Sequence, residues 1–333
     1  MSIRIGINGF GRIGRLAFRQ AMACPDVEVV AINDLIEIDY LAYLLRYDST
    51  HRRFPGEIRV ENGQLLVNGR TIRVTAERDP LQLRWGEVGA DYVLESTGFF
   101  LTEEKARAHL EAGAQRVVMS APSKDHTPMY VMGVNHTSYA GQPIVSNASC
   151  TTNCLAPIVK VLDQNFGMEW GLMTTIHSYT GDQRILDNSH RDLRRARAAA
   201  LNMVPTTTGA AKAVALVYPE VKGKLTGFAM RVPTPNVSAV DLTFGTSKGA
   251  TVEQVQAVMK EAAENGMKGI IKYSDLPLVS TDYAGTNEST IFDADLTYAM
   301  GDKAVKILAW YDNEWGYSQR VVDLAEVVAK NWK

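Results

Sequence analysis

The sequence predicts an α/β fold in two parts: a doubly wound, mostly parallel sheet, followed by an α+β domain with a mainly antiparallel sheet. The chain has 333 residues, which is too many for one typical hydrophobic core. Strand and helix patterns alternate through its first half, as expected when helices join parallel strands. Beyond residue 150 the strand patterns become longer, with a few helical patterns between them, which indicates an α+β domain.

The first part begins with a βαβ unit. A strand pattern at residues 3–8 precedes a helical pattern at 11–23 and a second strand pattern at 27–33. Residues 62–63 and 68–69 both read Asn-Gly between short apolar runs, so we expect two-residue hairpin turns there. The other elements expected in this part are a helix at 39–46, short antiparallel strands at 57–60, 64–67 and 71–75, strands at 92–96, 116–120 and 143–145, and a helix at 102–112.

The second part has longer strands and fewer helices. Strand patterns lie at 171–179, 225–232, 237–246 and 304–311, and helical patterns at 155–162, 209–217, 252–265 and 315–332. We expect a first domain at 1–149, joined by a C-terminal helix at 314–333, and a second domain at 150–313. Residues 180–203 are polar and arginine-rich without a clear period, and a connection of this length usually serves a function or an interface.

Composition excludes several classes of function. Hydrophobic residues make up 46% of the chain and charged residues 22%, with a formal net charge of −2, so we expect neither nucleic acid nor a membrane as a partner. No apolar run approaches the ~20 residues that cross a bilayer, and the N-terminus lacks a signal-peptide pattern. The three cysteines, Cys24, Cys150 and Cys154, suit neither a disulfide framework nor a metal site. We therefore expect the reducing cytoplasm and no metal.

Residues 9–14 read G-x-G-x-x-G between the first strand and the first helix. Alone this pattern is weak, and a glycine-rich turn without a ligand is the alternative. Its context favours a dinucleotide: Gly9 permits a tight turn, Gly11 lets the backbone approach a pyrophosphate, and Gly14 lets helix and strand pack closely. Asp34 follows the next strand, where it would accept hydrogen bonds from the adenosine ribose. The sequence therefore predicts a Rossmann-type, NAD-binding first domain.

Asp34 also bears on the choice of cofactor. A phosphate on the 2′ oxygen of the ribose would lie roughly 5 Å from this carboxylate, and each pair of unit charges would cost about 3 kcal/mol at an effective dielectric of ~20. NAD should therefore bind in preference to NADP.

Cys150 lies between a short apolar strand and a helical pattern, which places its thiol in the first turn of a helix. Unpaired backbone N–H groups and the positive end of the helix dipole favour a thiolate there. A buried, inert cysteine is the alternative, but the hydroxyl-rich neighbours argue against an apolar site. We therefore expect Cys150 to be a nucleophile.

An ionised Cys150 needs a second positive group. Lowering a thiol pKa from about 8.5 to about 6 takes ~3 kcal/mol, and a helix terminus supplies ~2 kcal/mol at most. His177, at the end of a strand pattern, is the candidate, because an imidazolium would hold the thiolate and shuttle a proton later. A core histidine without such a role is the alternative. The other five histidines lie in polar segments and are expected to face solvent: His51, His109, His126, His136 and His190.

Five longer motifs resemble the phosphorylating glyceraldehyde-3-phosphate dehydrogenase family. They are INGFGRIGR at 7–15, SCTTNC at 149–154, TTTGAAK at 206–212, MRVPTPN at 230–236 and WYDNEWGY at 310–317. They stand in the family's order, and the resemblance extends from the first strand to the C-terminal helix.

The resemblance implies a reaction. The Cys150 thiolate would attack the aldehyde of D-glyceraldehyde 3-phosphate to give a hemithioacetal, and His177 would take the hydroxyl proton as hydride leaves for the nicotinamide of NAD. Inorganic phosphate would then attack the thioester and release 1,3-bisphosphoglycerate, a step of glycolysis and gluconeogenesis. The family is tetrameric, which implies a homotetramer with the 180–203 segment at an interface.

The resemblance also implies the binding residues. Those that would contact the cofactor are Gly9, Gly11, Arg12, Ile13, Gly14, Asp34, Arg78, Ser120 and Asn313. Those that would hold the phosphate of the substrate are Thr180 and Arg231, with Arg195 nearby. Those that would hold the attacking phosphate are Ser149, Thr151, Thr208 and Gly209, the last two at a helix start that suits an anion.

One position departs from the pattern of strictly NAD-dependent members. Asn188 and Ser189 stand where those members often carry Leu-Pro, and small or polar residues there resemble members that also accept NADP. We therefore expect NAD preference with some use of NADP. Two alternatives stay open: an erythrose-4-phosphate dehydrogenase, against which the motif at 206–212 argues, and a non-catalytic or moonlighting nucleotide-binding protein, against which Cys150 and His177 argue together.

Overall fold

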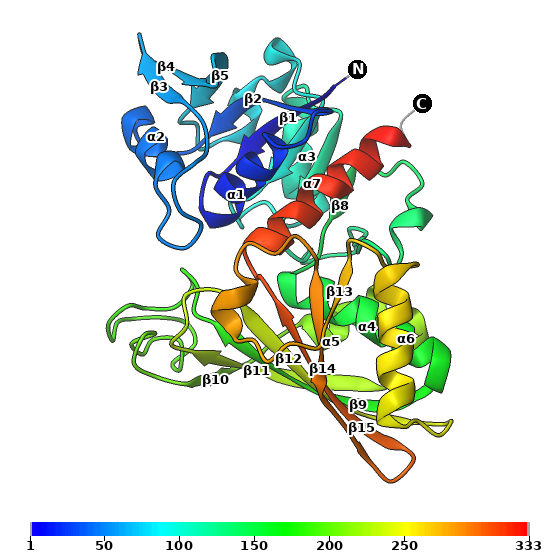
Figure 1. Ribbon diagram of the computed structural model, residues 1–333. Helices are drawn as coiled ribbons and strands as arrows, with labels where there is room; N and C mark the ends of the chain where they lie inside the picture. Colours follow the sequence, from blue (N-terminus) through cyan, green and yellow to red (C-terminus); the bar gives the residue numbers. More distant parts are fainter. Residues whose placement is uncertain (1, 332–333) are drawn as a thin grey trace. The chain divides into compact units, whose positions relative to one another are not determined.

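The computed structural model describes residues 2–331, which divide into two compact units. Unit 1 contains the chain up to Tyr130, the segment His136–Ala148 and the chain from Ser318 onward. Unit 2 contains Val131–Asn135 and Ser149–Tyr317. The two main divisions fall at 148/149 and 317/318, where the sequence analysis expects 149/150 and 313/314. Figure 1 shows the chain with its helices and strands labelled.

Unit 1 is built on an eight-stranded sheet in the order β3-β4-β5-β2-β1-β6-β7-β8. From β5 to β8 every neighbouring pair is parallel, which confirms the doubly wound sheet. The strands are β1 Ile3–Asn8, β2 Val27–Asn33, β3 Ile58–Glu61, β4 Gln64–Val67, β5 Arg70–Thr75, β6 Tyr92–Glu95, β7 Arg116–Met119 and β8 Ile144–Ser146. The helices are α1 Arg12–Ala21, α2 Ile38–Arg46 and α3 Glu103–Glu111, with the short 3-10 helices η1 Pro80–Leu83, η2 Trp85–Val88 and η3 His136–Ser138.

The order of the parallel strands creates a topological switch point. From β1 the chain crosses to β2 on one side of the sheet and later returns to β6 on the other. The carboxyl ends of β1 and β6, at Asn8 and Glu95, therefore lead into different connections, and ligands of doubly wound sheets bind outside such a point. Below it, Ile5, Ile7 and Val93 form part of the buried core of the sheet.

The two short hairpins lie where the sequence predicts them. β3 pairs antiparallel with β4, and β4 pairs antiparallel with β5. All four turn residues, Asn62-Gly63 and Asn68-Gly69, have φ angles between +50° and +77°. Two-residue turns of type I′ require such angles at both positions, and asparagine and glycine tolerate them.

Unit 2 is built on a seven-stranded mixed sheet in the order β10-β11-β9-β12-β15-β14-β13. Four of its six pairings are antiparallel, and two, β11 with β9 and β13 with β14, are parallel. The strands are β9 Met168–Ser178, β10 Val204–Thr206, β11 Leu225–Val232, β12 Ser238–Thr246, β13 Ile271–Ser274, β14 Thr290–Met300 and β15 Ala304–Tyr311. The helices are α4 Cys150–Phe166, α5 Ala210–Val217 and α6 Val252–Glu264, with the 3-10 helices η4 Pro219–Val221 and η5 Ser280–Tyr283.

Three strands of this sheet, β10, β13 and β14, do not appear among the elements expected from the sequence. The longest of them, β14, contains Asp293 and Asp295, whose low strand propensity hides the pattern. Tertiary contacts stabilise this strand instead: it pairs antiparallel with β15, and the helices α4 and α6 pack on it.

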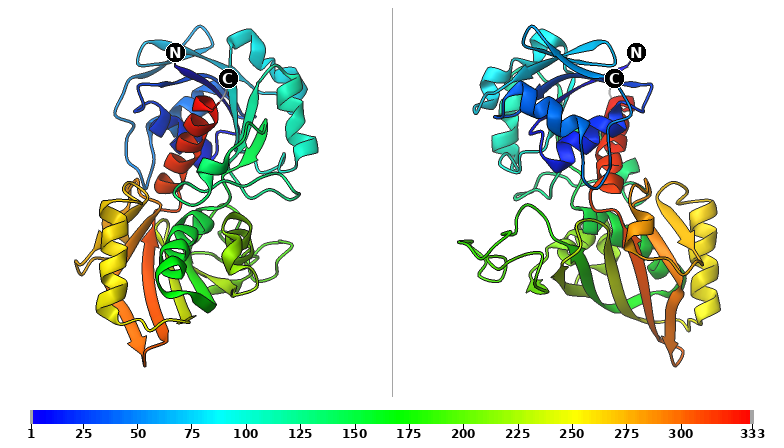
Figure 2. Two further views of the ribbon diagram at one scale, coloured as in Figure 1. Left: turned by 90° about the vertical axis from the view of Figure 1, so that its right-hand side faces the viewer. Right: turned by 60° about the vertical axis from the view of Figure 1, so that its left-hand side comes forward.

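Helices of unit 2 cover one face of its sheet. Helix α4 packs on β12, β14 and β15, α5 on β11, and α6 on β13 and β14. The two views of Figure 2 show these three helices on the same side of the strands. Several large apolar side chains of the strands nevertheless remain exposed: Trp170, Leu172, Ile176, Phe228, Tyr298 and Met300.

The C-terminal helix, α7 Trp315–Lys330, begins in unit 2 and continues in unit 1. The sequence analysis expects it to extend to Trp332, which lies outside the described residues.

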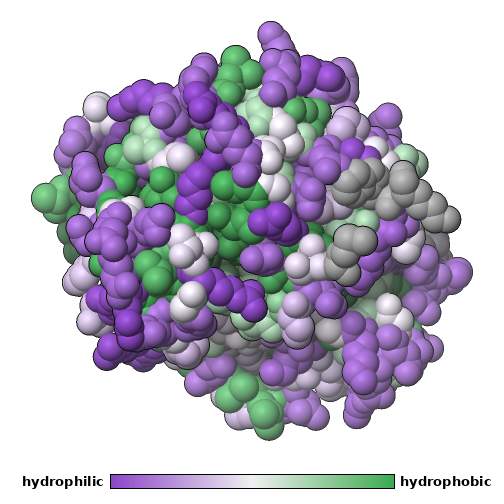
Figure 3. Space-filling model, turned by 90° about the horizontal axis from the view of Figure 1, so that it is seen from above, coloured by the Kyte–Doolittle hydropathy of each residue, from purple (hydrophilic) through white to green (hydrophobic). Residues whose placement is uncertain are grey.

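No helix between residues 2 and 331 is both long and apolar enough to cross a bilayer. The face shown in Figure 3 is mainly hydrophilic, with hydrophobic side chains in small groups between polar ones.

Candidate active site

The three glycines of the motif at 9–14, of which Gly9 and Gly11 lie between β1 and α1 and Gly14 lies in the first turn of α1, differ in their surroundings. Gly9 has a φ of +90°, and a Cβ there would lie 2.7 Å from the backbone nitrogen of Thr97. A Cβ on Gly14 would lie 2.0 Å from the carbonyl oxygen of Gly9, so only glycine lets α1 begin this close to β1. A Cβ on Gly11 would meet no atom of the described residues within 4 Å, which leaves open space at the start of α1. The turn and the close packing expected at Gly9 and Gly14 are therefore present.

A cavity of about 490 Å³ opens beside this loop and is lined by residues of unit 1. Its walls come from the ends of β1, β2, β5 and β6 and include Asp34, Arg78, Ser96 and Phe99. Both its size and its place outside the switch point fit a dinucleotide.

Asp34 is held at this cavity by backbone donors. Its Oδ2 accepts a hydrogen bond from the N–H of Phe10 at 2.7 Å, and its Oδ1 accepts one from Ile36 at 3.3 Å. The first bond links the carboxylate directly to the glycine loop. Asp34 therefore stands where an acidic residue meets the adenosine ribose in such folds.

The remaining cofactor residues expected in unit 1 lie around the same loop. The guanidinium of Arg12 pairs with Asp48. Burial raises the pKa of this carboxyl group, but hydrogen bonds from Arg12 and from the backbone outweigh burial and lower it to about 2. Ile13 follows in the first turn of α1 and is half-buried. Arg78 is exposed at the cavity, and the hydroxyl of Ser120 donates to the carbonyl oxygen of Glu95 at 3.2 Å.

Cys150 is the first residue of α4, as the sequence predicts. The hydroxyl of Ser149 caps this helix by accepting a hydrogen bond from the N–H of Thr152 at 3.1 Å. The first N–H groups of a helix lack intrahelical partners, and their partial positive charge favours an anion nearby. The local fold therefore directs a thiol to a position that stabilises its thiolate.

His177 and Arg231 reach Cys150 from two neighbouring strands. Strands β9 and β11 pair in parallel with His177 opposite Arg231. Nε2 of His177 lies 3.5 Å from Sγ of Cys150, and Nη1 of Arg231 donates a hydrogen bond to Nδ1 of His177 at 2.7 Å. The imidazole is only 4% exposed. The structure thus brings together the expected nucleophile, the expected base and an arginine.

Burial opposes charge on both members of the Cys150–His177 pair. It raises the pKa of the Cys150 thiol, against the charge of Arg231, which lowers it. Burial and then the charge of Arg231 lower the pKa of His177 to about 3. From the sequence we expect the second positive charge to be an imidazolium at His177. The structure differs, because a permanent cation, Arg231, already touches that ring.

A proton transfer within the pair changes this balance. When the proton of Cys150 moves to His177, opposite charges arise 3.5 Å apart. Their attraction, about 5 kcal/mol at an effective dielectric of ~20, offsets a large part of the cost of burial. The thiolate of Cys150 therefore depends on a partner that takes or binds its proton.

Two groups compete for Nδ1 of His177. The carbonyl oxygen of Ser178 lies 2.7 Å away and accepts an N–H, whereas Arg231 can only donate to a lone pair. With Arg231 in contact, the ring proton sits on Nε2 and faces Cys150. When Arg231 moves to another acceptor, Nδ1–H can bond to Ser178 and Nε2 can accept a proton. Nη1 of Arg231 also donates to the carbonyl oxygen of Ser178 at 3.0 Å, so both groups stand beside Nδ1 and the tautomer of His177 depends on which of them bonds to it.

Arg231 has a donor that is ready for an anion. Its Nε–H is buried and has no hydrogen-bond partner among the described residues. A buried guanidinium N–H of this kind costs free energy until a ligand accepts it, and phosphate accepts such donors well. Thr180, the second residue expected at the substrate phosphate, follows β9 by two residues and is half-buried.

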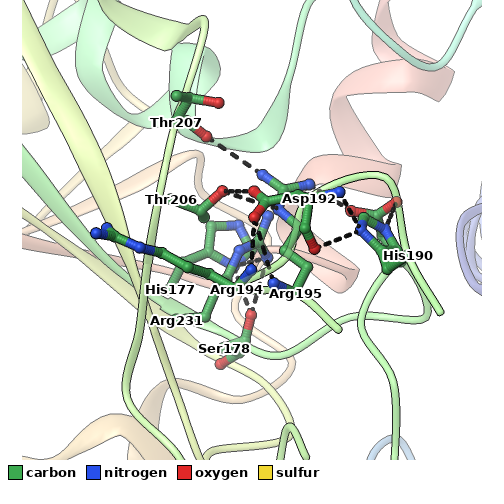
Figure 4. A network of polar contacts seen from close by, with 10 residues as sticks. His177, Ser178, His190, Asp192, Arg194, Arg195, Thr206, Thr207 and Arg231 are labelled. Atoms are coloured by element: carbon green, nitrogen blue, oxygen red, sulfur yellow. Dashed lines mark hydrogen bonds and ion pairs between the residues drawn. The ribbon is translucent and has the colours of Figure 1, made fainter. Parts of the chain in front are cut away.

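Arg195 is already engaged by protein groups (Figure 4). Its Nη1 pairs with Asp182, its Nε donates to the hydroxyl of Thr206 at 3.0 Å, and its Nη2 donates to the carbonyl oxygen of Thr207 at 3.2 Å. Asp192 also faces Nε at 3.6 Å. A phosphate bound by Arg195 would have to displace Asp182.

The residues expected at the attacking phosphate have protein partners of their own. The hydroxyl of Thr151 lies 2.9 Å from that of Tyr311, and the hydroxyl of Thr208 accepts a hydrogen bond from the N–H of Ala210 at 3.2 Å. Gly209 is the N-cap of α5, so Thr208 and Gly209 do stand at a helix start.

Asn313, expected at the nicotinamide carboxamide, is held in one orientation. Its Oδ1 accepts a hydrogen bond from the hydroxyl of Ser238 at 2.7 Å, and the side chain is buried in unit 2.

Tyr311 belongs to this site, although the sequence analysis gives it no role of its own. Its ring lies edge-on to the imidazole of His177 at 5.9 Å between centroids. Its hydroxyl lies 2.9 Å from that of Thr151 and 2.8 Å from that of Thr175. The two hydroxyl contacts hold Tyr311 in place beside the imidazole. The only sequence signal for Tyr311 is its place in the motif at 310–317.

His109 contradicts the expectation that it faces solvent: it is 0% exposed. Together with Ala106 it forms the buried side of α3, and its ring bonds to Trp85 and Glu95. Only two residues of α3 are buried, so the polar residues around His109 in the sequence gave no sign that its side chain is buried.

Within residues 2–331 no group of three or more His, Cys, Asp or Glu side chains could hold a metal ion. Cys24, Cys150 and Cys154 are free thiols.

Two family models match the chain. "Glyceraldehyde 3-phosphate dehydrogenase, NAD binding domain" matches residues 3–103, and "Glyceraldehyde 3-phosphate dehydrogenase, C-terminal domain" matches 149–313. Among similar proteins, the glyceraldehyde-3-phosphate dehydrogenase A of Escherichia coli (strain K12) is 57% identical over 331 residues, which is 99% of this chain and 100% of that protein. The glyceraldehyde-3-phosphate dehydrogenase of Salmonella typhimurium (strain LT2) is 56% identical over the same shares.

Proposed function

Because the chain belongs to the glyceraldehyde-3-phosphate dehydrogenase family, an NAD-dependent oxidoreductase family, we propose that it oxidises D-glyceraldehyde 3-phosphate with inorganic phosphate to 1,3-bisphosphoglycerate. This is a reaction of glycolysis and gluconeogenesis. The observation that carries the proposal is the contact of Cys150 with His177 at 3.5 Å, with Arg231 bonded to the same imidazole.

The two units divide the work in this proposal. Unit 1 binds NAD at the glycine loop and Asp34, and unit 2 supplies the catalytic residues and the contacts between subunits. Bound NAD supplies the hydride acceptor. Its adenosine would lie on Asp34 and Arg78 and its pyrophosphate on the start of α1, while Asn313 would orient the carboxamide.

The residues of unit 2 perform the covalent steps. The sulfur of Cys150 attacks the aldehyde carbon and forms a hemithioacetal, and Nε2 of His177 removes the hydroxyl proton. The substrate phosphate binds Arg231 and Thr180, and by drawing Arg231 from Nδ1 it leaves His177 able to accept that proton. The free Nε–H of Arg231 supports this assignment.

Loss of the hydroxyl proton to His177 and of hydride to bound NAD would leave a thioester on Cys150. Attack of inorganic phosphate on its carbonyl carbon would break the C–S bond, release the acyl phosphate and return the thiolate of Cys150. We assign the attacking phosphate to Ser149, Thr151, Thr208 and Gly209, with Arg195 nearby. The N-cap position of Gly209 supports the assignment, because the first N–H groups of α5 face an anion there. Arg195 can join only if Asp182 releases it.

The glycine loop offers a matched pair of variants. Gly11→Ala adds a Cβ in open space, so the free energy of unfolding should change by less than about 0.5 kcal/mol, yet NAD should bind about tenfold more weakly or worse, because the pyrophosphate approaches there. Gly14→Ala puts a Cβ 2.0 Å from the backbone of Gly9 and should lower stability by more than about 3 kcal/mol. Thermal unfolding and calorimetric titration with NAD measure both. Unchanged NAD affinity in Gly11→Ala would remove the loop from the cofactor site.

We also infer a homotetramer in the cytoplasm. Exposed apolar side chains support assembly: Ile185, Leu186, Leu193 and Leu201 in the 180–203 segment are each at least 72% exposed, and further ones lie on strands of unit 2. Three free thiols suit a reducing compartment. Sedimentation velocity at micromolar concentration tests the assembly, and a monomer there would contradict it.

One assay with D-glyceraldehyde 3-phosphate, varying NAD, NADP and phosphate, tests the activity. Activity should depend absolutely on phosphate, whereas an erythrose-4-phosphate dehydrogenase would release its acid without it. Asn188 and Ser189 support limited use of NADP. In the reverse direction, a kcat/KM for NADPH more than about 1,000-fold below that for NADH would exclude dual use.

A further inference from the structure

A second buried polar cluster lies in unit 1, at the carboxyl end of β6. Glu95 is 0% exposed. Its Oε2 accepts a hydrogen bond from Nδ2 of Asn8 at 2.7 Å and lies 3.0 Å from Nε2 of His109. Its Oε1 accepts the backbone N–H of Thr97 at 2.8 Å and also its hydroxyl. Four donors therefore converge on the two oxygens of Glu95, an arrangement that suits a carboxylate.

His109 faces Glu95 as a neutral donor. Nε1 of Trp85 can only donate, and it donates to Nδ1 of His109 at 3.1 Å. The ring proton therefore sits on Nε2, where it points at Glu95. The indole thus fixes both the tautomer and the orientation of the imidazole.

A chain of hydrogen bonds extends from Glu95 in the other direction. Oδ1 of Asn8 accepts from Nδ2 of Asn33 at 2.8 Å, and Oδ1 of Asn33 accepts from the hydroxyl of Thr75 at 2.9 Å. The same amide of Asn33 exchanges two bonds of 2.9 Å with the backbone of Glu77. Nδ2 of Asn8, Nδ2 of Asn33 and the hydroxyl of Thr75 each donate to the next residue toward Glu95, so the carboxylate sets the direction of these three bonds, while Nδ2 of Asn33 also donates to Glu77.

This series crosses the switch point of the sheet. The bond between Asn8 and Glu95 joins the ends of β1 and β6, the two strands that diverge there. Asn8, Asn33, Glu77 and Thr97 also line the cavity beside the glycine loop, whereas Glu95, like His109 and Trp85, lies behind that lining.

Thr97 connects the same carboxylate to the glycine loop. Its backbone nitrogen bonds to Glu95 and lies so close to Gly9 that a Cβ on Gly9 would be 2.7 Å away. A shift of Thr97 would therefore move the wall against which the loop is packed.

We propose that Glu95 is a positioning residue for the dinucleotide: through Asn8, Asn33 and Thr97 its carboxylate holds the ends of four strands in the arrangement that NAD binds. This inference rests on the proposed binding of NAD in the cavity of unit 1. Glu95 does not line that cavity, so it acts through its neighbours.

Glu95→Gln is the central test, because it keeps the size of the side chain and replaces one acceptor by a donor. The NH2 group of the new glutamine would meet the N–H groups of Asn8 and His109, or that of Thr97, which are also donors. At least one hydrogen bond to residue 95 would therefore be lost, and the bonds of the series would no longer all be directed toward this residue. Calorimetry should show a Kd for NAD raised about tenfold or more. In kinetics KM for NAD should rise, while kcat at saturating NAD should stay within about threefold.

Tyr139→Phe is the matched control. Tyr139 is buried in unit 1, and its hydroxyl donates to the carbonyl oxygen of Gln142 at 3.0 Å, away from the cavity lining. This variant loses a buried hydrogen bond and some stability, but its Kd for NAD should stay within about twofold. Hydrogen exchange of the backbone at 97–99 should accelerate in Glu95→Gln and not in Tyr139→Phe.

The outcomes separate this inference from the proposed function. If the unmodified protein fails to bind NAD, the proposed cofactor site is wrong. If it binds NAD and Glu95→Gln binds equally well, the positioning role is wrong. If Glu95→Gln does not fold, the variant His109→Gln tests the proposal in its place. It weakens one hydrogen bond to the carboxylate of Glu95 and should still raise the Kd for NAD about threefold. An unchanged Kd for NAD in His109→Gln would overturn the proposal.

Discussion

Replacing Cys150 with serine should lower turnover by at least about 10⁴-fold and leave NAD binding unchanged. A serine hydroxyl ionises far less readily than a thiol, and burial already raises the pKa of the thiol at this position. Cys150 belongs to unit 2, whereas the cavity assigned to NAD is lined by unit 1, so Kd for NAD should stay within about twofold. Steady-state kinetics and calorimetry on the same preparation give both numbers. Turnover that survives the substitution would refute the nucleophile assignment.

Cys154→Ser provides the control for this experiment. Cys154 lies on the same helix, and its Sγ lies 2.9 Å from the hydroxyl of Thr290. Burial raises the pKa of this thiol to about 12, so it does not ionise in the working range. Serine can keep the contact with Thr290, and turnover should stay within about tenfold. Alkylation with iodoacetamide should inactivate the unmodified protein and Cys154→Ser alike.

Local patterns predicted those parts of the fold that local chemistry decides. The Asn-Gly turns at 62–63 and 68–69 need positive φ angles, which few other residues tolerate. At Gly9 and Gly14 a Cβ would lie 2.0–2.7 Å from a backbone atom, so only glycine fits there. The helix start at Cys150 likewise follows from its capping serine. Such signals lie within a few residues, so one sequence is enough to find them.

The contact of Cys150 with His177 was predicted, but other contacts between distant residues escaped prediction. Strand β14 exists because β15 and two helices cover it, and its aspartates give no hint of that. His109 reads as a surface residue until Trp85 and Glu95, 24 and 14 positions away, are placed beside it. The same limit applied to Arg231, since its contact with His177 spans 54 positions along the chain.

The pairing of β9 with β11 explains why that last contact matters for the chemistry. Register sets His177 opposite Arg231, so the base and the residue assigned to the substrate phosphate form one hydrogen-bonded unit. A substrate without a phosphate would leave Arg231 on Nδ1 and the imidazole unable to accept a proton through Nε2. If Arg231 binds the substrate phosphate as proposed, recognition of the phosphate and activation of the base would be coupled through this one side chain.

Replacing His177 with asparagine should lower kcat by about 10²–10⁴-fold, because the hemithioacetal loses the group that removes its proton. It should also move the ionisation of Cys150. Burial raises the pKa of this thiol, and the charge of Arg231 and hydrogen bonds at Thr151 oppose that effect. The substitution also removes the imidazole whose Nε2 lies 3.5 Å from Sγ. The thiolate is the reactive form, so less of it at a given pH means slower alkylation. Because the pKa of Cys150 rises in His177→Asn, its reaction with iodoacetamide should be slower than that of the unmodified protein at neutral pH. The difference should disappear as the pH increases and both thiols become ionised.

The measurement is the pH profile of alkylation, followed without substrate between about pH 5 and pH 10 in the unmodified protein, His177→Asn and His190→Asn. In His177→Asn the midpoint should lie at least about one unit higher, which corresponds to ~1.4 kcal/mol less stabilisation of the thiolate. His190 contacts Asp182 and Asp192 rather than the thiol, so His190→Asn should keep the midpoint of the unmodified protein. A profile in His177→Asn that coincides with that of the unmodified protein would mean that the imidazole does not stabilise the thiolate of Cys150. The sulfur would then owe its reactivity to the helix start and Arg231 alone.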